Sequence, residues 1–240
     1  MGRFFLRLRD LLFVPRCAAC GERLLPECGP LCERCYASYE METAMGCPFC
    51  GQSFFACVCP SDTLKRGGVT LLPKLFRYLP HGDGVSNRMI YLLKHRAPRP
   101  LVRFLAHELA EAVRPHLPKG KGELIVTFAP RTRRAVRRYG FDHMAHLSRA
   151  VAEELSAEWG PLLRRRDGKE QKKRPTRRER FENMKGAYSY IGKEELRGRR
   201  ILLLDDVTTS GATLLFALRA LRRAGARRIA VGVLGATVSM

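Results

Sequence analysis

Apolar and polar positions follow two different periods along most of the chain after about residue 60. Short apolar runs predict buried strands at 123–129, 187–191, 201–204 and 228–234. Helical spacing of apolar residues predicts helices at 85–93, 101–113, 141–159 and 214–224, with Trp159 closing the apolar face of the third. Strand, helix and strand at these distances predict right-handed parallel βαβ units, and therefore an α/β fold.

Two segments depart from this pattern. Residues 4–12 place apolar side chains at helical spacing with arginines outside, which predicts an amphipathic helix. That helix would dock on the larger domain or, alternatively, bind a membrane surface or nucleic acid. Residues 164–180 contain ten Lys or Arg, three acids and almost no apolar residue, a pattern typical of a solvated, mobile loop.

All nine cysteines lie in the first quarter of the chain. Three C-x2-C pairs and one C-x-C pair point to metal, because clustered cysteines of the cytosol seldom form structural disulfides. A tetrahedral zinc ion is coordinated by two such pairs. We therefore predict two structural all-cysteine Zn2+ sites, with Cys28 in neither of them. The ligands are Cys17, Cys20, Cys32, Cys35, Cys47, Cys50, Cys57 and Cys59, although a nearby group could take the place of the last.

The pairing of the cysteine pairs is open at this point. Sequential pairing, which we favour, gives two ribbons, whereas interleaved pairing gives a RING-like module. Merely buried cysteines and an iron–sulfur cluster are the alternatives to zinc. The change in composition after the last cysteine predicts two domains, a helix and double zinc module at 1–62 and an α/β domain at 63–240.

The chain has 240 residues, of which 45% are hydrophobic, so it can form a substantial core. Lys and Arg number 44 against 23 Asp and Glu, and the net charge of +21 favours an anionic partner. No apolar stretch reaches 18 residues, which excludes a membrane-spanning helix. Charges interrupt the N-terminus before a signal peptide could form, so we expect a cytoplasmic protein.

The most informative segment is 201–213, where an apolar strand is followed by Asp205 and Asp206 and then by a hydroxyl-rich turn into a helix. Ligands of parallel sheets bind at the carboxyl ends of strands, and the amides of a helix start can hold a phosphate. Gly211 permits close approach of the backbone, and carboxylates accept hydrogen bonds from sugar hydroxyls. The segment therefore predicts a ribose 5-phosphate site; an ordinary helix-capping turn is the alternative. Neither a Walker nor a Rossmann motif is present.

The segment 205–213 resembles the 5-phosphoribosyl 1-pyrophosphate (PRPP) motif of type I phosphoribosyltransferases. Together with the cysteine pairs, the chain resembles the ComF family, which joins a double zinc ribbon to a phosphoribosyltransferase-like domain. The segments 92–95, 137–143 and 180–186 also resemble that family. This chain departs from it at Tyr139, Asp142 and His143, where the family has Arg, Asn and Gln.

The resemblance implies a type I phosphoribosyltransferase-like parallel sheet flanked by helices, with Asp205 and Asp206 as the catalytic pair on the ribose hydroxyls. It implies Mg2+ bound with PRPP, a hood formed by 164–180, and Arg131 facing the pyrophosphate. Asp206 and His143 are the candidates for a base. The PRPP-binding set is Asp205, Asp206, Val207, Thr208, Thr209, Ser210, Gly211, Ala212, Thr213 and Arg131.

Two functions are compatible with these residues. One is a phosphoribosyltransferase that acts on an unidentified acceptor. The other, implied by the ComF resemblance, is a factor in DNA uptake during natural transformation, with single-stranded DNA and a DNA-uptake helicase or motor as partners. The arginines between 131 and 138 form either a solvated helix face or part of an anion-binding surface.

Overall fold

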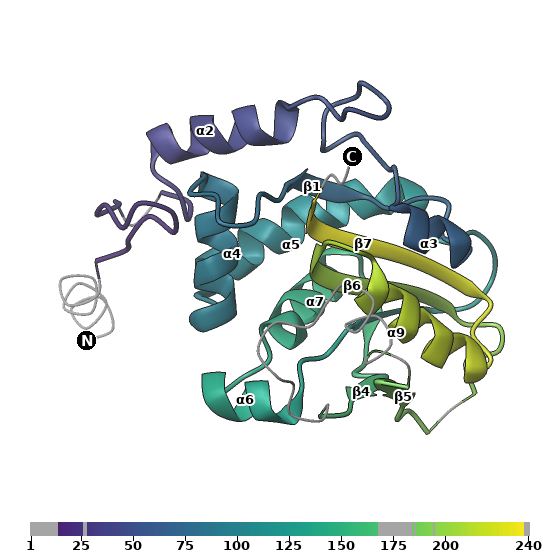
Figure 1. The fold of residues 1–240 in the computed structure, drawn as a ribbon. Coiled ribbons are helices and arrows are strands. Elements are labelled where there is room, and N and C mark those ends of the chain that lie inside the picture. The colour runs from purple at the N-terminus through teal and green to yellow at the C-terminus, as the bar shows by residue number, and fades with distance from the viewer. Residues whose placement is uncertain (1–13, 26–27, 168–183, 185, 194, 238–240) are drawn as a thin grey trace, which may run out of the picture.

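The computed structural model describes residues 14–25, 28–167, 184, 186–193 and 195–237 (Figure 1). The helices are α2 (Glu33–Ala44), α3 (Asp62–Arg66), α4 (Val85–His95), α5 (Arg99–Val113), the 3-10 helix η1 (Arg114–His116), α6 (Arg133–Tyr139), α7 (His143–Glu154) and α9 (Ala212–Arg223). The strands are β1 (Lys74–Arg77), β2 (Leu124–Phe128), β3 (Glu158–Trp159), β4 (Leu163–Arg165), β5 (Tyr188–Tyr190), β6 (Arg200–Thr208) and β7 (Arg228–Ala236). None of the described helices has the length and apolar character needed to cross a membrane.

Five parallel strands form the central sheet in the order β1-β7-β6-β2-β3. Val126 of β2 lies opposite Leu202 of β6, which in turn lies opposite Ala230 of β7. The chain turns from β2 outward to β3 and from β6 in the opposite direction to β7. The strand order therefore reverses between β2 and β6, and ligands of open α/β sheets bind at the carboxyl ends of strands beside such a point.

Helices cover both faces of this sheet (Figure 1). On β6, Leu202 and Leu204 pack in one apolar cluster with α4, α5 and α7, while Ile201 and Leu203 pack in a second cluster with α9. Successive side chains of a strand point to opposite faces, so a continuous apolar run is what a sheet covered on both sides requires. The parallel α/β prediction is confirmed.

A separate two-stranded antiparallel sheet pairs β4 with β5, with Arg164 opposite Ser189. The strand predicted at 187–191 is confirmed, but the loop prediction for 164–180 is wrong at its start. Leu163 and Tyr188 are buried in the α9 cluster, and this anchorage holds the basic residues that follow Leu163 in a strand. The rest of that basic stretch, from residue 168, lies outside the described residues, as does the helix predicted at 4–12.

The helix predicted at 141–159 is shorter than expected. It ends at Glu154, and Ser156 takes a left-handed conformation with φ of 50° that a helix cannot continue. Trp159 then lies in β3, and its ring nitrogen donates to Ser148 Oγ at 2.9 Å. Trp159 therefore packs back on α7 from a strand instead of closing its apolar face.

Helix α2, which the sequence pattern did not predict, connects the cysteine-rich segment to the larger sheet (Figure 1). Tyr39 is buried, and its ring packs edge-on against Phe104 and Phe76 with centroid distances of 5.3 and 6.4 Å. Its hydroxyl donates to Glu108 on α5 at 3.2 Å. Cys17 and Leu31 belong to the same apolar cluster. The first half of the cysteine-rich segment thus shares a core with α4 and α5.

Glu42 at the end of α2 supplies the N-terminal cap of α4. Its two carboxylate oxygens accept from the backbone N–H groups of Val85 at 2.8 Å and Ser86 at 2.9 Å. Gly84 precedes the helix and provides no side-chain cap; a Cβ there would lie 2.6 Å from Glu42 Oε1. The carboxylate satisfies two amides that the helix leaves unpaired and lies at the positive end of its dipole.

We expect Glu42→Ala to lower the free energy of unfolding by about 1 kcal/mol, the usual cost of losing a helix cap. Glu40→Ala is the matched control, because Glu40 lies exposed on the same helix. Urea unfolding of both variants measures the difference. Equal losses in the two variants would contradict the capping role of Glu42.

Candidate functional site

Asp205 and Asp206 lie at the carboxyl end of β6, beside the reversal of strand order. The strand predicted from the apolar run 201–204 does reach both carboxylates, and it continues beyond them to Thr208. Pairing with β7 explains the extension, because Asp205 is opposite Val233 and Thr208 is opposite Ala236. The predicted pair therefore has the rigidity of a central strand.

Asp206 is held by side chains from two helices. Its Oδ2 lies 3.0 Å from Lys94 Nζ, in the last turn of α4, and 2.7 Å from His143 Nε2, at the start of α7. Its Oδ1 accepts from the backbone N–H of Val207. Burial acts to raise the pKa of Asp206, but the hydrogen bond from His143 and the charge of Lys94 outweigh it and hold that pKa well below its usual range.

Asp205 has the opposite electrostatic environment. It is 7% exposed, and its Oδ1 accepts from the backbone N–H of Asp206 at 3.0 Å. Burial, followed by the neighbouring charge of Asp206, raises the pKa of Asp205 well above its ordinary value. Two adjacent carboxyls whose pKa values are driven apart are suited to different roles, one an ionised acceptor and the other a group that can exchange a proton.

The loop after the carboxylates opens directly into α9. Gly211 occupies the N-cap with φ of 79°, and no side chain caps the helix there. A Cβ on Gly211 would lie 2.7 Å from Leu64 Cγ and from Ser61 Oγ, so both the conformation and the space require glycine. The backbone N–H of Thr237 donates to Thr208 O at 2.9 Å and fixes the start of the loop. The backbone N–H of Ala212 donates to Ser210 Oγ at 3.4 Å, and the N-cap itself provides no side-chain cap, so the next amides of this first turn are available for a phosphate.

Arg131 lies on the same side of the sheet, after β2. Its guanidinium donates to Lys94 O at 3.0 Å and lies over the ring of Tyr139, 4.6 Å from the centroid. Its Nη1 is buried without a hydrogen-bond partner among the described residues. The structure thus brings Arg131, Lys94 and Asp206 together.

The sequence pattern assigns no role to Lys94 and marks His143 only as a candidate for a base. Both lie at helix ends, and Lys94 and His143 are distant from Asp206 in the sequence. The resemblance of 92–95 and 137–143 to ComF segments was the one signal that marked them. Apolar periodicity carries no information about which helix ends meet at a strand end.

The cysteines form two groups in sequential order, Cys17, Cys20, Cys32, Cys35 and Cys47, Cys50, Cys57, Cys59. This grouping confirms the sequential pairing and includes Cys59, whereas Cys28 is exposed and belongs to neither group. Within each group the four Sγ atoms lie within 4.8 Å of one another. The Cys20 and Cys32 sulfurs are 3.7 Å apart, which fits a tetrahedral ion with metal–sulfur bonds of about 2.3 Å.

The thiols of each group have the electrostatics of a cation site. Burial raises the pKa of Cys17, but backbone hydrogen bonds from Cys20, Cys32 and Ala19 lower it to about 7. Burial, with hydrogen bonds among the thiols, raises the pKa of Cys35 well above its ordinary value and that of Cys59 to about 12. Four thiolates so close together need a cation to balance them, so both groups fit a metal such as zinc.

Comparison with known proteins adds a domain assignment. Residues 147–237 match the family model described as the phosphoribosyl transferase domain. A search of curated proteins finds no match. The match spans β6, both carboxylates and the loop into α9, and this part of the chain is phosphoribosyltransferase-like.

Several solved structures have some likeness to this chain. One is a purine phosphoribosyltransferase from Pyrococcus horikoshii, which is 19% identical in sequence, with a TM-score of 0.34. The alignment covers 58% of this chain and 77% of that chain. A phosphoribosylpyrophosphate synthetase from Mycobacterium smegmatis has 14% identity, coverage of 58% and 34%, and a TM-score of 0.34. An adenine phosphoribosyltransferase from Leishmania tarentolae has 17% identity, coverage of 60% of each chain, and a TM-score of 0.35. This chain thus spans about a third of the mycobacterial protein.

We expect the two carboxylates to change stability in opposite directions. Asp205→Asn should raise the free energy of unfolding at pH 7 by about 0.5–2 kcal/mol, because asparagine requires neither a buried charge beside Asp206 nor the uptake of a proton on folding. Asp206→Asn should lower it by about 1–3 kcal/mol, because Lys94 and His143 lose an ionised acceptor. Urea unfolding of both variants at pH 7 measures these changes.

The pH dependence follows from the direction of each pKa shift. Because the pKa of Asp205 is raised in the folded protein, this carboxyl destabilises the fold by an amount that grows as the pH rises above about 4, which is the pKa of an aspartate in the unfolded chain. The lowered pKa of Asp206 gives a stabilisation that is present above about pH 4 and is lost as the pH falls toward its folded value. If Asp205→Asn and Asp206→Asn changed the free energy of unfolding at pH 7 in the same direction, the opposite pKa shifts of the two carboxyls would be contradicted.

Proposed function

We propose that the Asp205–Asp206 pair and the loop from Thr208 to Thr213 bind the ribose 5-phosphate part of PRPP. The observation that carries this proposal is the position of two carboxylates directly before an uncapped helix start, at the reversal of strand order. The 5-phosphate binds at the amides of the first turn of α9, and the ribose hydroxyls donate to the carboxylates.

The rest of the site suits displacement of pyrophosphate. Arg131, whose Nη1 has no hydrogen-bond partner among the described residues, would neutralise the leaving group. Mg2+ would be held mainly by pyrophosphate and sugar oxygens and, when bound, would add to this charge neutralisation. Breaking the bond between C1 and the pyrophosphate oxygen gives an oxocarbenium-like state. Catalysis then depends on positioning and on stabilising charge. The activity is transfer of the phosphoribosyl group to an acceptor.

We also propose that each four-cysteine group holds a structural zinc ion. Four thiolates close the coordination shell and leave no position for a substrate. A segment with so little core of its own depends on the metal for its fold. The shared cluster of Cys17, Leu31 and Tyr39 with α4 and α5 supports a module that is docked on the larger domain.

A second candidate function is the ComF-like role in DNA uptake, in the cytoplasm and with single-stranded DNA and an uptake motor as partners. It is supported by the order of two four-cysteine groups before a phosphoribosyltransferase-like domain. The net charge of +21 is also suited to nonspecific contacts with phosphates. Binding of PRPP and handling of DNA are compatible in one molecule.

The zinc proposal predicts two zinc ions per chain, one for each four-cysteine group. We expect Cys35→Ser to remove one ion and to reduce helical circular dichroism, because α2 begins between two of its ligands. Cys28→Ser, the matched control, should retain both ions, since Cys28 belongs to neither group. Elemental analysis is the measurement; bound iron in place of zinc, or an equal loss in the Cys28 variant, would overturn the prediction.

The PRPP proposal predicts saturable binding of PRPP with Mg2+ to the zinc-loaded protein by isothermal titration. We expect the double variant Asp205→Asn, Asp206→Asn to lose at least about tenfold in affinity, since charged hydrogen bonds to the ribose become neutral ones. No binding by the wild type would refute the ribose-phosphate site.

Binding of a single-stranded oligonucleotide serves as the control for this variant. We expect both proteins to bind it with the same affinity and with the same fall as salt increases, because phosphate contacts release counterions. Equal far-ultraviolet circular dichroism of the two proteins shows that the variant is folded. An affinity independent of salt would contradict the electrostatic account of DNA binding.

A further inference from the structure

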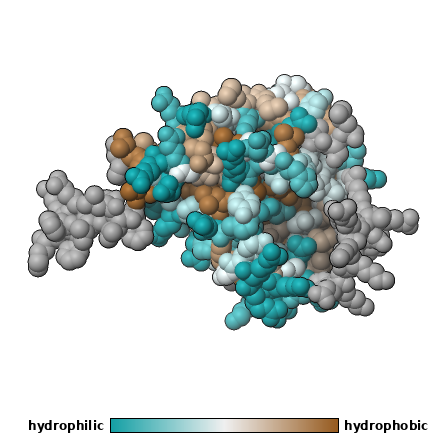
Figure 2. Space-filling model, turned by 60° about the vertical axis from the view of Figure 1, so that its left-hand side comes forward, coloured by the Kyte–Doolittle hydropathy of each residue, from teal (hydrophilic) through white to brown (hydrophobic). Residues whose placement is uncertain are grey.

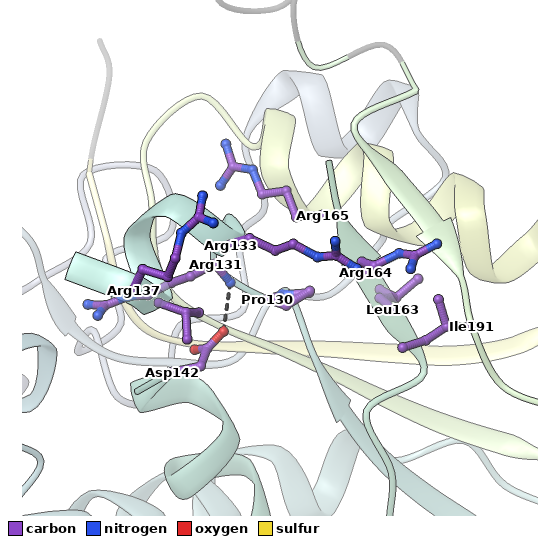
Figure 3. A pocket seen from close by; sticks show the side chains of 10 residues that line it. Pro130, Arg131, Arg133, Arg137, Asp142, Leu163, Arg164, Arg165 and Ile191 are labelled. Atoms are coloured by element: carbon purple, nitrogen blue, oxygen red, sulfur yellow. Dashed lines mark hydrogen bonds between the residues drawn. The ribbon is translucent and has the colours of Figure 1, made fainter. Parts of the chain in front are cut away.

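A cavity of about 370 Å³ lies between α6 and the β4–β5 sheet (Figure 3). Its wall combines apolar and cationic side chains. The residues that line it are Pro130, Arg131, Arg133, Val136, Arg137, Asp142, Leu163, Arg164, Arg165 and Ile191. The volume is typical of a small-molecule site, and the apolar residues suit a compact ring or aliphatic body.

The arginines come from two elements, with Arg133 and Arg137 on α6 and Arg164 and Arg165 on β4. Among the described residues, no acidic side chain forms an ion pair with any of these four. Figure 2 shows hydrophilic residues gathered along the lower edge of the molecule, where α6 lies in Figure 1. Arg165 Nη2 donates to Met184 Sδ at 3.4 Å and its guanidinium lies over the ring of Tyr188, 5.6 Å from the centroid. Within the part of the chain that the structure describes, the four guanidinium groups thus lack an acidic partner, and their like charges repel one another unless an anion is bound.

The acids nearest to this cavity are already engaged. Asp142 accepts from the backbone N–H groups of Arg131 at 2.7 Å and Met144 at 3.0 Å, and Figure 3 shows the first of these bonds. Asp167 accepts from the backbone N–H of Arg134 at 3.2 Å. Neither neutralises an arginine side chain of the cavity. The net charge of its lining is therefore strongly positive.

The cavity is adjacent to the proposed ribose site. Asp142 lines it, and the next residue, His143, bonds to Asp206. A bridge between Thr132 and Arg165 ties the loop after β2 to β4, so the two walls are held together. A ligand bound here lies next to the group that the carboxylates position.

We propose that this cavity is the acceptor site and that the acceptor is a small anion, with an apolar body carrying carboxylate or phosphate. This acceptor proposal rests on the proposed function, which is the binding of PRPP at Asp205 and Asp206. An atom of the acceptor donates an electron pair to C1 of the ribose as the bond from C1 to pyrophosphate breaks. Pyrophosphate leaves with that bonding pair, and any proton lost by the acceptor passes to water. A neutral base is disfavoured, because it would leave the arginines unpaired.

The experiment uses phthalate and phenyl phosphate as probes, with phthalamide as the uncharged counterpart, titrated into the zinc-loaded protein. We expect both anions to bind and phthalamide not to bind. Arg133→Gln with Arg164→Gln should weaken anion binding roughly tenfold or more, because each removes a charge-assisted hydrogen bond donor. Arg223→Gln with Arg227→Gln is the matched control, since it removes two exposed arginines elsewhere, and should leave binding within about twofold.

Three further results decide the proposal. Phthalate that still binds in the presence of saturating Mg-pyrophosphate supports a separate acceptor site that shares only Arg131 with the leaving group, whereas complete displacement would assign the cavity to the leaving group and overturn the proposal. Equal binding of phthalamide would also overturn it. If an oligonucleotide bound in a way that required Arg133 and Arg164, and phthalate did not bind, the cavity would be assigned to nucleic acid. That result would overturn the proposal.

The same titrations separate this proposal from the proposed function. The Asp205→Asn, Asp206→Asn variant should bind phthalate like the wild type, because its carboxylates do not line the cavity. Anion binding by a protein that does not bind PRPP would refute the ribose-phosphate site and, with it, the acceptor role. Binding of PRPP without binding of either anion would refute the acceptor proposal alone.

Discussion

The arrangement of the site depends on the placement of two adjacent carboxylates in a buried strand end. Such a pair is unfavourable unless neighbouring groups compensate at least one charge. Lys94 and His143 compensate Asp206 from two different helices, at 3.0 and 2.7 Å. For Asp205, the hydrogen bond found within the described residues comes from the backbone amide of its neighbour, at 3.0 Å. The ends of α4 and β6 and the start of α7 must therefore meet at one point, and this requirement fixes the geometry around the proposed ribose site.

The cysteine-rich segment contributes to that geometry through α2. Its Glu42 caps the start of α4, and the last turn of α4 carries Lys94 to Asp206. One helix thus connects the end of α2, between the two four-cysteine groups, with the carboxylate pair. The cysteine-rich segment can in this way support a site to which it contributes no ligand. The position of α4, rather than any direct contact of a cysteine with substrate, gives the module its role.

The sequence predicted the features that local pattern controls. The runs at 201–204 and 228–234 are continuous apolar strands because both faces of the sheet are covered, and the cysteine spacing indicated the sequential groups that the structure contains. It did not predict α2, whose apolar positions are interrupted by polar ones, or the strand at Leu163–Arg165, which is held by burial of a single leucine. Contacts between distant helix ends, such as Lys94 with Asp206, have no signature in periodicity.

The most direct test of the central claim is a crystal structure with ribose 5-phosphate bound. We expect the phosphate at the backbone amides of the first turn of α9, next to Gly211. We also expect the ribose hydroxyls within hydrogen-bond distance of Asp205 and Asp206. A sugar phosphate bound only among the arginines of α6 and β4, with both carboxylates uncontacted, would contradict it.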